Sequence, residues 1–582
     1  MVKILIDDHS LEINEGATIL DAACQAGIPI PTLCYYKDLC AIGACRLCLV
    51  ELEGTDRLTT ACNTIAEEGM VIRTNTPRVR QARRVNLELI LADHNNNCPH
   101  CSRNMNCSLQ QIAKTLNIKD TPYPANIRCK EWPEEHPLLK DDSKCVYCMR
   151  CLAVCNDIQS LGVWDLFGTA SNLKIDLKNA KSITDVHNCV LCGQCITHCP
   201  VGALSARDDT DKVIAALNDP EQVVIFQIAP AIRTAWGEPF GLSEAEATVG
   251  KMVAAVKATG ADYVFDTSFS ADMTIMEEGT ELLERLKNRD QYQWPMFTSC
   301  CPAWVRFVKS QYPDLVGNLS TAKSPQQMFG ATAKTWFAQS KKIDPQKIFL
   351  VSVMPCVAKK QESALPNING ADAGLDVDAV LTNRELANLI GVFNVNVHQL
   401  EDQDFDDILG RRTGAGEIFG STGGVTEAAL RTLHFVLTGQ NPDPDAYMSL
   451  RAVPGKPDLR EATVEIGDLK IKAAIVSGLA NTRQLLEEVR SGAVDYDFVE
   501  VMSCPGGCVG GGGQPIVCGA NLEPEQQTQT RRKNLYEQDQ QNATRFSHEN
   551  PAVQQAYQEY FEKPLSHVSH KLLHTNHQGW DI

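Results

Sequence analysis

Cysteine is the residue type whose number and spacing most clearly predict chemistry in this chain. There are 24 cysteines in 582 residues; 18 of them precede residue 200, and none falls between Cys199 and Cys300. In a reducing cytosol, spaced sets of cysteines favour metal sites over a disulfide framework. The sequence therefore predicts a front part that carries metal clusters, joined to a back part whose cysteines serve a separate site.

The strongest local signal is an internal repeat, CVYCMRCLAVC at 145–155 and CVLCGQCITHC at 189–199. Both copies have the spacing C-x2-C-x2-C-x3-C, which suits the corners of a 4Fe-4S cubane. The second copy ends in Cys-Pro, whereas the first ends in Cys155-Asn156. In two-cluster ferredoxins the fourth cysteine of each motif serves the other cluster. The predicted ligand sets are Cys145, Cys148, Cys151 and Cys199 for one cluster, and Cys189, Cys192, Cys195 and Cys155 for the other.

A 2Fe-2S cluster is predicted near the N-terminus, where five cysteines leave the ligand choice open. Cys40, Cys45 and Cys48 reproduce the plant-type C-x4-C-x2-C spacing. The alternative, Cys34-x10-Cys45-x2-Cys48-x13-Cys62, resembles the N-terminal domain shared by the large iron-sulfur subunit of respiratory complex I and several hydrogenases. On this resemblance we assign Cys34, Cys45, Cys48 and Cys62 as ligands and Cys40 as a neighbour.

A further set combines one histidine with three cysteines, as His94-x3-Cys98-x2-Cys101-x5-Cys107. Such a set could bind zinc tetrahedrally. Its position between two iron-sulfur modules, and its resemblance to the histidine-ligated 4Fe-4S site of the same two families, favour iron. His100 is the competing histidine, and we expect it to be solvated.

The back part carries three cysteine motifs, TSCCPAW at 298–304, MPCVAKKQE at 354–362 and EVMSCPGGCVGGGGQP at 500–515. Cys300 and Cys301 are adjacent, and adjacent cysteines do not readily ligate one small cluster together. In this order the motifs resemble the three signatures of the iron-only (FeFe) hydrogenases. With the front domains, the resemblance extends over essentially the whole chain.

The resemblance implies a six-iron H-cluster, in which a cysteine bridges a 4Fe-4S cubane to a two-iron subsite carrying CO, cyanide and an azadithiolate. The implied activity is the reversible conversion of 2H+ and 2e- to H2. By motif, the cubane ligands are Cys301, Cys356, Cys504 and Cys508, with Cys508 as the bridge. The residues implied around the two-iron subsite are Ala229, Pro230, Ala231, Gln326, Met354, Lys359, Phe419 and Met502. The family usually has Ser where Ala231 stands, so one hydroxyl contact to a cyanide is missing here.

A buried site of this kind also needs a proton relay. The resemblance implies Cys300 as the inner donor, followed by Glu278, Ser320, Glu281 and Arg285. The two glutamates and the arginine lie at i, i+3 and i+7 of one predicted helix and so share a face. The alternative interpretation of these three residues is an ordinary solvated, charged helix face.

Alternating strands and helices must position the back-part motifs. From about residue 210, apolar strands such as VVIFQIAP, KIFLVSVMP and YDFVEVMSCP alternate with helices, and the cysteine motifs follow strand ends, where α/β folds bind ligands. We predict an α+β and α/β multidomain chain: ferredoxin-like iron-sulfur domains followed by a two-lobed α/β hydrogenase domain. The expected domains are 1–78 (2Fe-2S), 79–125 (histidine-ligated 4Fe-4S), 136–207 (two 4Fe-4S clusters) and 208–582 (H-cluster).

Composition excludes several other classes of protein. Acidic residues outnumber basic ones by 72 to 54, which argues against a nucleic-acid surface. The N-terminus has too short an apolar run for a secretory signal and no uncharged apolar run reaches 18 residues, so we expect a cytoplasmic protein without a membrane span.

The glycines of 414–420 and 510–513 lack phosphate-loop spacing and are expected to allow close backbone approach to the cofactor. Cys24, Cys129 and Cys518 belong to no set and are expected to be packing or surface thiols.

The expected substrates are H2 and protons, and the expected cofactors are the H-cluster, one 2Fe-2S and three accessory 4Fe-4S clusters. The chain has no convincing flavin or nicotinamide motif, so flavin-containing NAD(P)-binding subunits, ferredoxin, or both are the expected partners. The front domains favour a catalytic subunit of an NAD(P)-linked or electron-bifurcating complex over a stand-alone ferredoxin hydrogenase. Two further alternatives are a hydrogen sensor, against which Cys300, Glu278 and Glu281 argue, and a plain electron carrier.

Overall fold

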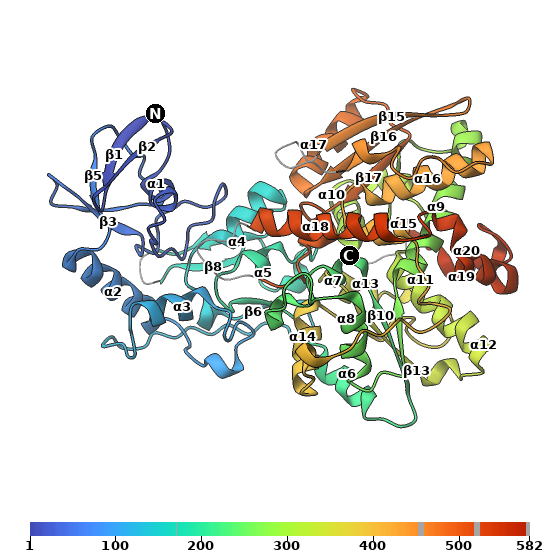
Figure 1. The fold of residues 1–582 in the computed structure, drawn as a ribbon, viewed down its shortest axis with the longest axis horizontal. Helices are drawn as coiled ribbons and strands as arrows, with labels where there is room; N and C mark the ends of the chain where they lie inside the picture. Colours follow the sequence, from blue (N-terminus) through green and yellow to red (C-terminus); the bar gives the residue numbers. More distant parts are fainter. Residues whose placement is uncertain (170–171, 452–458, 517–523, 578–582) are drawn as a thin grey trace.

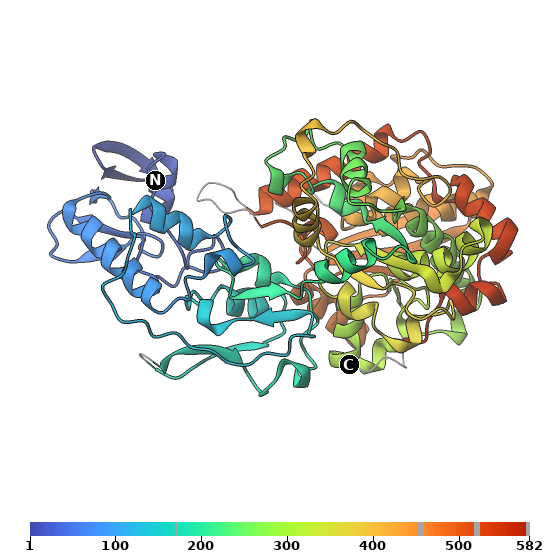
Figure 2. The same ribbon diagram turned by 90° about the horizontal axis from the view of Figure 1, so that it is seen from below.

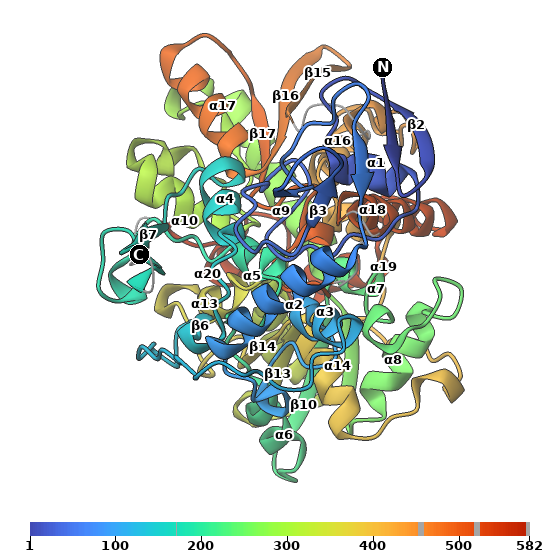
Figure 3. The same cartoon turned by 90° about the vertical axis from the view of Figure 1, so that its left-hand side faces the viewer.

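The computed structural model describes residues 1–169, 172–451, 459–516 and 524–577. The front domains form an arm beside the larger body of the back part (Figures 1 and 2). Viewed from the N-terminal side, the arm lies in front of that body (Figure 3). The structure confirms the predicted fold class. Cys518 lies outside the described residues.

The first domain is a small mixed sheet with the strand order β2-β1-β5-β3-β4. Helix α1 (Ile19–Gln25) begins at a capping box, in which Thr18 accepts from the Asp21 backbone and the Asp21 side chain accepts from the Thr18 backbone. The strands are β1 (Val2–Ile6), β2 (His9–Ile13), β3 (Leu49–Leu52), β4 (Leu58–Thr60) and β5 (Val71–Arg73). β1 and β2 form an antiparallel pair, with Val2 opposite Ile13.

The cysteine repeat forms two copies of one local backbone. In the first copy Tyr147 and Met149 have positive φ angles of 51° and 61°, and in the second Leu191 and Gly193 have 58° and 71°. These residues occupy the third and fifth positions of the motif in both copies. The repeat in sequence is therefore also a repeat in backbone conformation. The neighbouring elements are α2 (Pro77–Ala92), α3 (Ser108–Thr115), β6 (Leu138–Lys140), α4 (Arg150–Ala153), β7 (Trp164–Phe167), β8 (Lys174–Leu177), α5 (Gln194–His198) and β9 (Leu204–Ala206).

The back part contains two sheets, which lie in the lower and upper halves of the larger body (Figure 1). The first has the order β11-β10-β13-β14 and is wholly parallel. The second has the order β12-β17-β16-β15, with only β15 antiparallel. Their bounds are β10 (Val223–Ile228), β11 (Tyr263–Asp266), β12 (Met296–Phe297), β13 (Ile348–Val353), β14 (Ala379–Leu381), β15 (Leu459–Ile466), β16 (Leu469–Ser477) and β17 (Phe498–Met502).

Helices cover both sheets, so the inner strands are buried on both faces. This explains why β10, β13 and β17 read as continuous apolar runs rather than alternating ones. The principal helices are α6 (Thr210–Leu217), α7 (Pro230–Arg233), α8 (Val249–Lys257), α9 (Ser268–Lys287), α10 (Pro302–Gln311), α11 (Pro325–Thr332), α14 (Asn383–Val392), α16 (Gly424–Thr438), α17 (Leu479–Ser491), α18 (Pro524–Gln541), α19 (Pro551–Ala556) and α20 (His567–Leu573). None of the helices in the described ranges is long and apolar enough to cross a bilayer.

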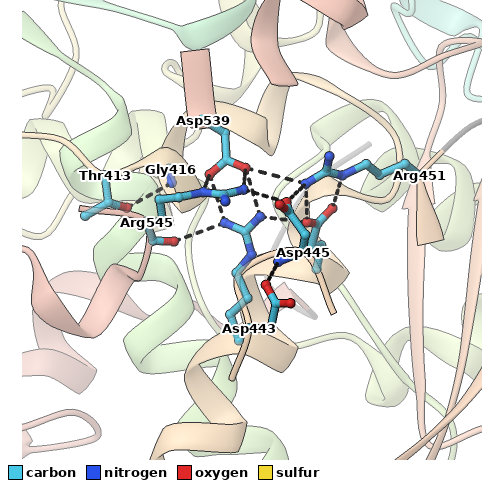
Figure 4. A network of polar contacts seen from close by, with 9 residues as sticks. Thr413, Gly416, Asp443, Asp445, Arg451, Asp539 and Arg545 are labelled. Atoms are coloured by element: carbon cyan, nitrogen blue, oxygen red, sulfur yellow. Dashed lines mark hydrogen bonds and ion pairs between the residues drawn. The ribbon is translucent and has the colours of Figure 1, made fainter. Parts of the chain in front are cut away.

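A buried ionic network joins helix α18 to α16, which packs against the second sheet (Figure 4). Arg431 of α16 donates two hydrogen bonds of 2.9 Å to Asp539 of α18. Arg545 and Arg451 also converge on Asp539, at 2.6 and 3.5 Å. Nearer the start of the same helix, Arg531 donates to the Val509 carbonyl oxygen at 3.2 Å. Helix α18 therefore supports the loop that carries Cys508.

Candidate active site and its electron-transfer clusters

The four predicted cubane ligands come together from both lobes. Cys356 follows β13 of the first sheet, whereas Cys301 and Cys504 follow β12 and β17 of the second. Cys508 begins a short 3-10 turn, Cys508–Gly510. Burial, and then the charges of Cys301 and Cys356, raise the pKa of the Cys508 thiol well above its usual range. The thiols are therefore near enough to oppose one another's ionisation.

This donor set fits a sulfur-ligated iron cluster. Burial raises the pKa of Cys356 to about 12 and the pKa of Cys504 well above its usual range, so these thiols would stay protonated without a compensating cation. Iron would supply that charge, because it binds cysteine as thiolate. All four ligands and Cys300 nevertheless keep some accessible surface, intermediate between buried and exposed.

Lys359 is fixed beside Cys300. Its Nζ donates to the Cys300 carbonyl oxygen at 3.2 Å and to Glu362 Oε2 at 2.8 Å. Burial opposes the lysine charge, but the Glu362 carboxylate outweighs it and raises the pKa of Lys359. Gln326 donates to the Lys359 carbonyl oxygen at 3.3 Å and to Glu362 Oε2 at 3.2 Å. Gln326 thus supports the Lys359–Glu362 pair, and Glu362 is a site residue that the motif did not single out.

The remaining predicted pocket residues are buried on surrounding elements. Ala229 and Pro230 begin α7 after β10, and the Ala231 carbonyl oxygen accepts from Gln514 Nε2 at 2.8 Å. The Ala231 side chain packs in one apolar cluster with Val509 and Cys508. Three further side chains are buried, at 4, 7 and 2% exposure: Met354, Phe419 and Met502. Phe419 and Met502 belong to a hydrophobic cluster against which Cys300 and Cys508 pack.

The glycine run 510–513 lies in close contact with neighbouring backbone. A Cβ at Gly511 would lie 2.1 Å from the Pro355 carbonyl oxygen, and one at Gly512 would lie 2.3 Å from that of Cys192. These glycines therefore permit close contact with neighbouring backbone. They bring the Cys508 loop against the Cys356 loop and against the last front-part motif.

The predicted proton-relay residues beyond Cys300 are buried. Glu278, Glu281 and Arg285 on α9 are only 1, 7 and 3% exposed, so the solvated-face interpretation is wrong. Ser320 Oγ donates to Glu281 Oε2 at 2.8 Å, and Arg285 donates to Glu281 Oε1 at 2.6 Å. Burial raises the pKa of the Cys300 thiol, and the nearby Glu278 carboxylate raises it further. Cys300 is therefore a neutral thiol.

Glu278 is poised to hold a proton. Burial, followed by the charge of Glu281, raises the pKa of Glu278 to about 8. Neither carboxyl oxygen makes a hydrogen bond of normal geometry, although Ser320 and the Ser299 backbone lie close by. At neutral pH the group is mostly protonated and can donate toward Cys300.

The N-terminal cysteines separate into a set of four and one neighbour. A hydrogen bond from Cys34 lowers the pKa of Cys45 to about 6, and Cys48 and Cys62 form a similar pair. Cys40 instead points its Sγ at the Cys148 carbonyl oxygen, at 3.6 Å. The arrangement favours Cys34 over Cys40 as the fourth ligand.

The other accessory sets also converge. A cavity of about 20 Å³ is lined by all four predicted ligands of one cubane, Cys145, Cys148, Cys151 and Cys199. A cavity of about 440 Å³ is lined by His94, Cys98, Cys101 and Cys107. In the second ferredoxin set, the charges of Cys189 and Cys155 help to raise the pKa of Cys192 and of Cys195. These four thiols therefore lie near one another.

His94 fits the role of a ligand, and His100 does not. The His94 ring is buried, its Nδ1 has no hydrogen-bond partner, and a backbone hydrogen bond at Lys144 holds the ring. His100 is exposed, as expected. His94 is therefore the histidine that completes the set with Cys98, Cys101 and Cys107 around their shared cavity.

Direct contacts join the predicted ligand sets to one another. Arg103 donates to the Cys199 carbonyl oxygen at 3.3 Å, next to the histidine-ligated set. Arg150 donates to the Tyr35 carbonyl oxygen at 2.6 Å, next to the 2Fe-2S set. Both outer sites thus meet the Cys145 set. Neither arginine was predicted, although Arg150 lies within the first cysteine repeat.

Fold and site together define an iron-sulfur oxidoreductase with a sulfur-ligated reaction centre. Residues 222–512 match the family "Iron only hydrogenase large subunit, C-terminal domain". Other matches are a 2Fe-2S cluster binding domain (1–77), an NADH-ubiquinone oxidoreductase-G iron-sulfur binding region (83–122), a 4Fe-4S binding domain (183–205) and an iron hydrogenase small subunit (525–580). The chain belongs to the iron-only hydrogenase family, and it is an FeFe hydrogenase.

Individual relatives agree with this family. The NADP-reducing hydrogenase subunit HndD of Solidesulfovibrio fructosivorans is 42% identical over 99% of both chains. Iron hydrogenase 1 of Clostridium pasteurianum is 39% identical over 99% of both chains. A solved structure of a variant of the apo FeFe-hydrogenase HydA1 from Chlamydomonas reinhardtii matches with a TM-score of 0.56 and 36% identity, covering 63% of this chain and 98% of that one.

Proposed function

We propose that this hydrogenase is the catalytic subunit of an NAD(P)-linked or electron-bifurcating complex. It would interconvert protons, electrons and H2 at an H-cluster held by Cys301, Cys356, Cys504 and Cys508. The observation that carries the proposal is the full-length similarity to an NADP-reducing hydrogenase subunit, in a chain without a nucleotide-binding motif of its own. The partner would supply the flavin and the NAD(P) site, and we expect both in the cytoplasm.

The four front-part ligand sets would hold one 2Fe-2S and three 4Fe-4S clusters. Electrons would pass from the two outer clusters to the Cys145 set, then to the Cys189 set, and then to the catalytic site. The last transfer is supported by the contact of 3.9 Å between Cys504 Sγ and the Cys192 carbonyl oxygen. The proposed domains remain 1–78, 79–125, 136–207 and 208–582.

When bound, the six-iron group supplies the redox chemistry of H2. The protein residues would manage the proton. For H2 formation, Cys300 would give its thiol proton to the site, and Glu278 would then return a proton to the Cys300 thiolate. Glu281, once it has taken up a proton from the solvent side, would reprotonate Glu278 through the Ser320 hydroxyl, which must turn from its present acceptor, Glu281 Oε2. H2 oxidation uses the same groups in reverse.

A stand-alone ferredoxin hydrogenase is the second candidate, favoured by the full-length similarity to iron hydrogenase 1. Purification at native expression level separates the two. We expect flavin-containing subunits to co-elute, and the purified assembly to reduce NAD(P)+ with H2. A single chain that exchanges electrons with ferredoxin at full rate would favour the second candidate.

A further inference from the structure

The segment that carries Ser320 is paired along both edges. On one side Leu319 forms a parallel bridge with Phe297 of β12, and on the other Ala322 forms an antiparallel bridge with His574. The Lys323 N–H donates to the Leu573 carbonyl oxygen and the Thr575 N–H to the Thr321 carbonyl oxygen, at 2.8 Å each. Residues 574–577, the C-terminal segment, therefore lie beside the relay segment and pair with it at an isolated bridge. Figure 1 shows α20 at the edge of the larger body, beside α11.

Two buried histidines of this C-terminal segment contact the relay segment directly. His577 Nε2 lies 2.7 Å from the Ser320 carbonyl oxygen, so Nε2–H is the donor. His574 Nδ1 lies 2.8 Å from Thr321 Oγ1. The other ring nitrogen of His574 lies 3.0 Å from Glu277 Oε2, and Glu277 in turn accepts from Tyr557 at 2.6 Å. Through Glu277, the C-terminal segment thus contacts α9, the helix that carries Glu278 and Glu281.

Every polar group of Ser320 is held. Its N–H donates to the Phe297 carbonyl oxygen at 2.8 Å, its carbonyl accepts from His577, and its hydroxyl donates to Glu281 and accepts from the Ala322 N–H at 3.2 Å. The Thr321 N–H donates to Glu281 Oε2 at 3.0 Å. The distances from the Ser320 hydroxyl to Glu281 and to Glu278 therefore depend on contacts from the C-terminal segment.

We propose that His577 and His574 are positioning residues of the proton relay, which hold Ser320 and Thr321 for proton transfer between Glu281 and Glu278. The inference rests on the proposed hydrogenase mechanism. It gives the C-terminal segment, 253 residues from Thr321 to His574 along the chain, a part in proton supply. His577 faces Glu281, Lys309 and Arg285, and His574 faces Glu277 and the neighbouring ring of His570. Burial lowers the pKa of His577 to about 4, so the ring stays a neutral N–H donor at working pH.

The test compares His577→Ala, His577→Gln and His574→Ala with the wild type in the matured, iron-loaded full chain. His567→Ala is the matched control, because His567 is an exposed histidine on α20. The readouts are iron per chain, H2/D2O exchange and the solvent deuterium isotope effect on dye-coupled turnover. H2/D2O exchange needs the proton relay but no electron transfer through the front clusters.

We expect His577→Ala and His574→Ala to keep their iron, to slow exchange roughly tenfold or more and to raise the isotope effect. His577→Gln, which can place an N–H near the Nε2 position, should recover part of the rate. Normal iron with unchanged exchange overturns the proposal, and so does a loss of activity fully accounted for by loss of iron. A wild type that exchanges no H2 would instead count against the proposed function itself.

Discussion

Cys504 Sγ lies 3.9 Å from the carbonyl oxygen of Cys192, so a predicted ligand of the reaction centre touches the backbone of a predicted ligand of the nearest accessory cluster. Gly193 and Gly512 make this contact possible, since a Cβ on either would overlap the other's backbone. This contact supports the proposed entry of electrons at Cys504, whereas the proposed proton relay lies along α9.

The adjacent pair Cys300 and Cys301 should separate these two paths experimentally. Cys300→Ala should keep its full iron content and lose turnover by roughly 10²–10⁴-fold, because it removes only the inner proton donor. Cys301→Ala should lose iron from the cubane. Iron analysis and H2-dependent dye reduction measure both effects, with exposed Cys129→Ala as the control. Loss of iron in Cys300→Ala with retention in Cys301→Ala would reverse the assignment.

Glu278 should make the two reaction directions respond oppositely to pH. H2 formation needs a protonated Glu278, so its rate should fall as pH rises through about 8, the raised pKa of this buried carboxyl. H2 oxidation needs the ionised form and should rise over the same range. Glu278→Gln should remove both transitions and slow turnover by about 10²–10⁴-fold. Glu284→Gln, on the exposed side of α9, is the control, and an identical pH profile in both variants would contradict the assignment.

The N-terminal cluster should distinguish Cys34 from Cys40. Cys34→Ala should abolish the EPR signal of the reduced 2Fe-2S cluster, because Cys34 pairs with Cys45. Cys40→Ala should retain that signal, because its sulfur faces the Cys148 carbonyl oxygen instead. The opposite pattern would restore the plant-type ligand set.

The buried network around Asp539 should contribute strongly to stability. Arg431→Met leaves the Asp539 and Glu427 carboxylates short of a buried partner, and we expect it to cost about 3–5 kcal/mol of unfolding free energy. Arg411→Met breaks the exposed pair with Asp407 and should cost at most about 1 kcal/mol. Thermal or denaturant unfolding of the two apo variants compares them. Equal, small losses would show that the network does not hold α18 in place.

Cysteine spacing predicted much of this site because cluster ligands are mostly local in sequence. The exchange of Cys199 and Cys155 between the two cubanes followed from the motif alone, and the structure lines one cavity with the first of these sets. The strand ends that carry Cys356 and Cys504 followed from apolar runs and the α/β pattern. The reaction itself came from resemblance, because spacing could not assign separate roles to Cys300 and Cys301.

What the sequence could not predict depends on tertiary contact. Helical spacing put Glu278, Glu281 and Arg285 on one face, but periodicity does not say whether a charged face is buried. Thr321 and His574 are 253 residues apart, and neither lies in a motif. The glycines of 510–513 signalled close approach correctly, yet their partners are the backbone of Pro355 and Cys192, which only the fold brings near.

The central claim is that Cys508 and its three companions hold the group that converts H2. The most direct measurement is H2-dependent dye reduction by matured wild-type protein and by Cys508→Ala, alongside iron content and the infrared bands of CO and cyanide. We expect the wild type to reduce the dye and show the bands, and Cys508→Ala to keep the front clusters while losing both. A wild type with full iron and CO bands but no H2-dependent reduction would contradict the account, as would an active Cys508→Ala.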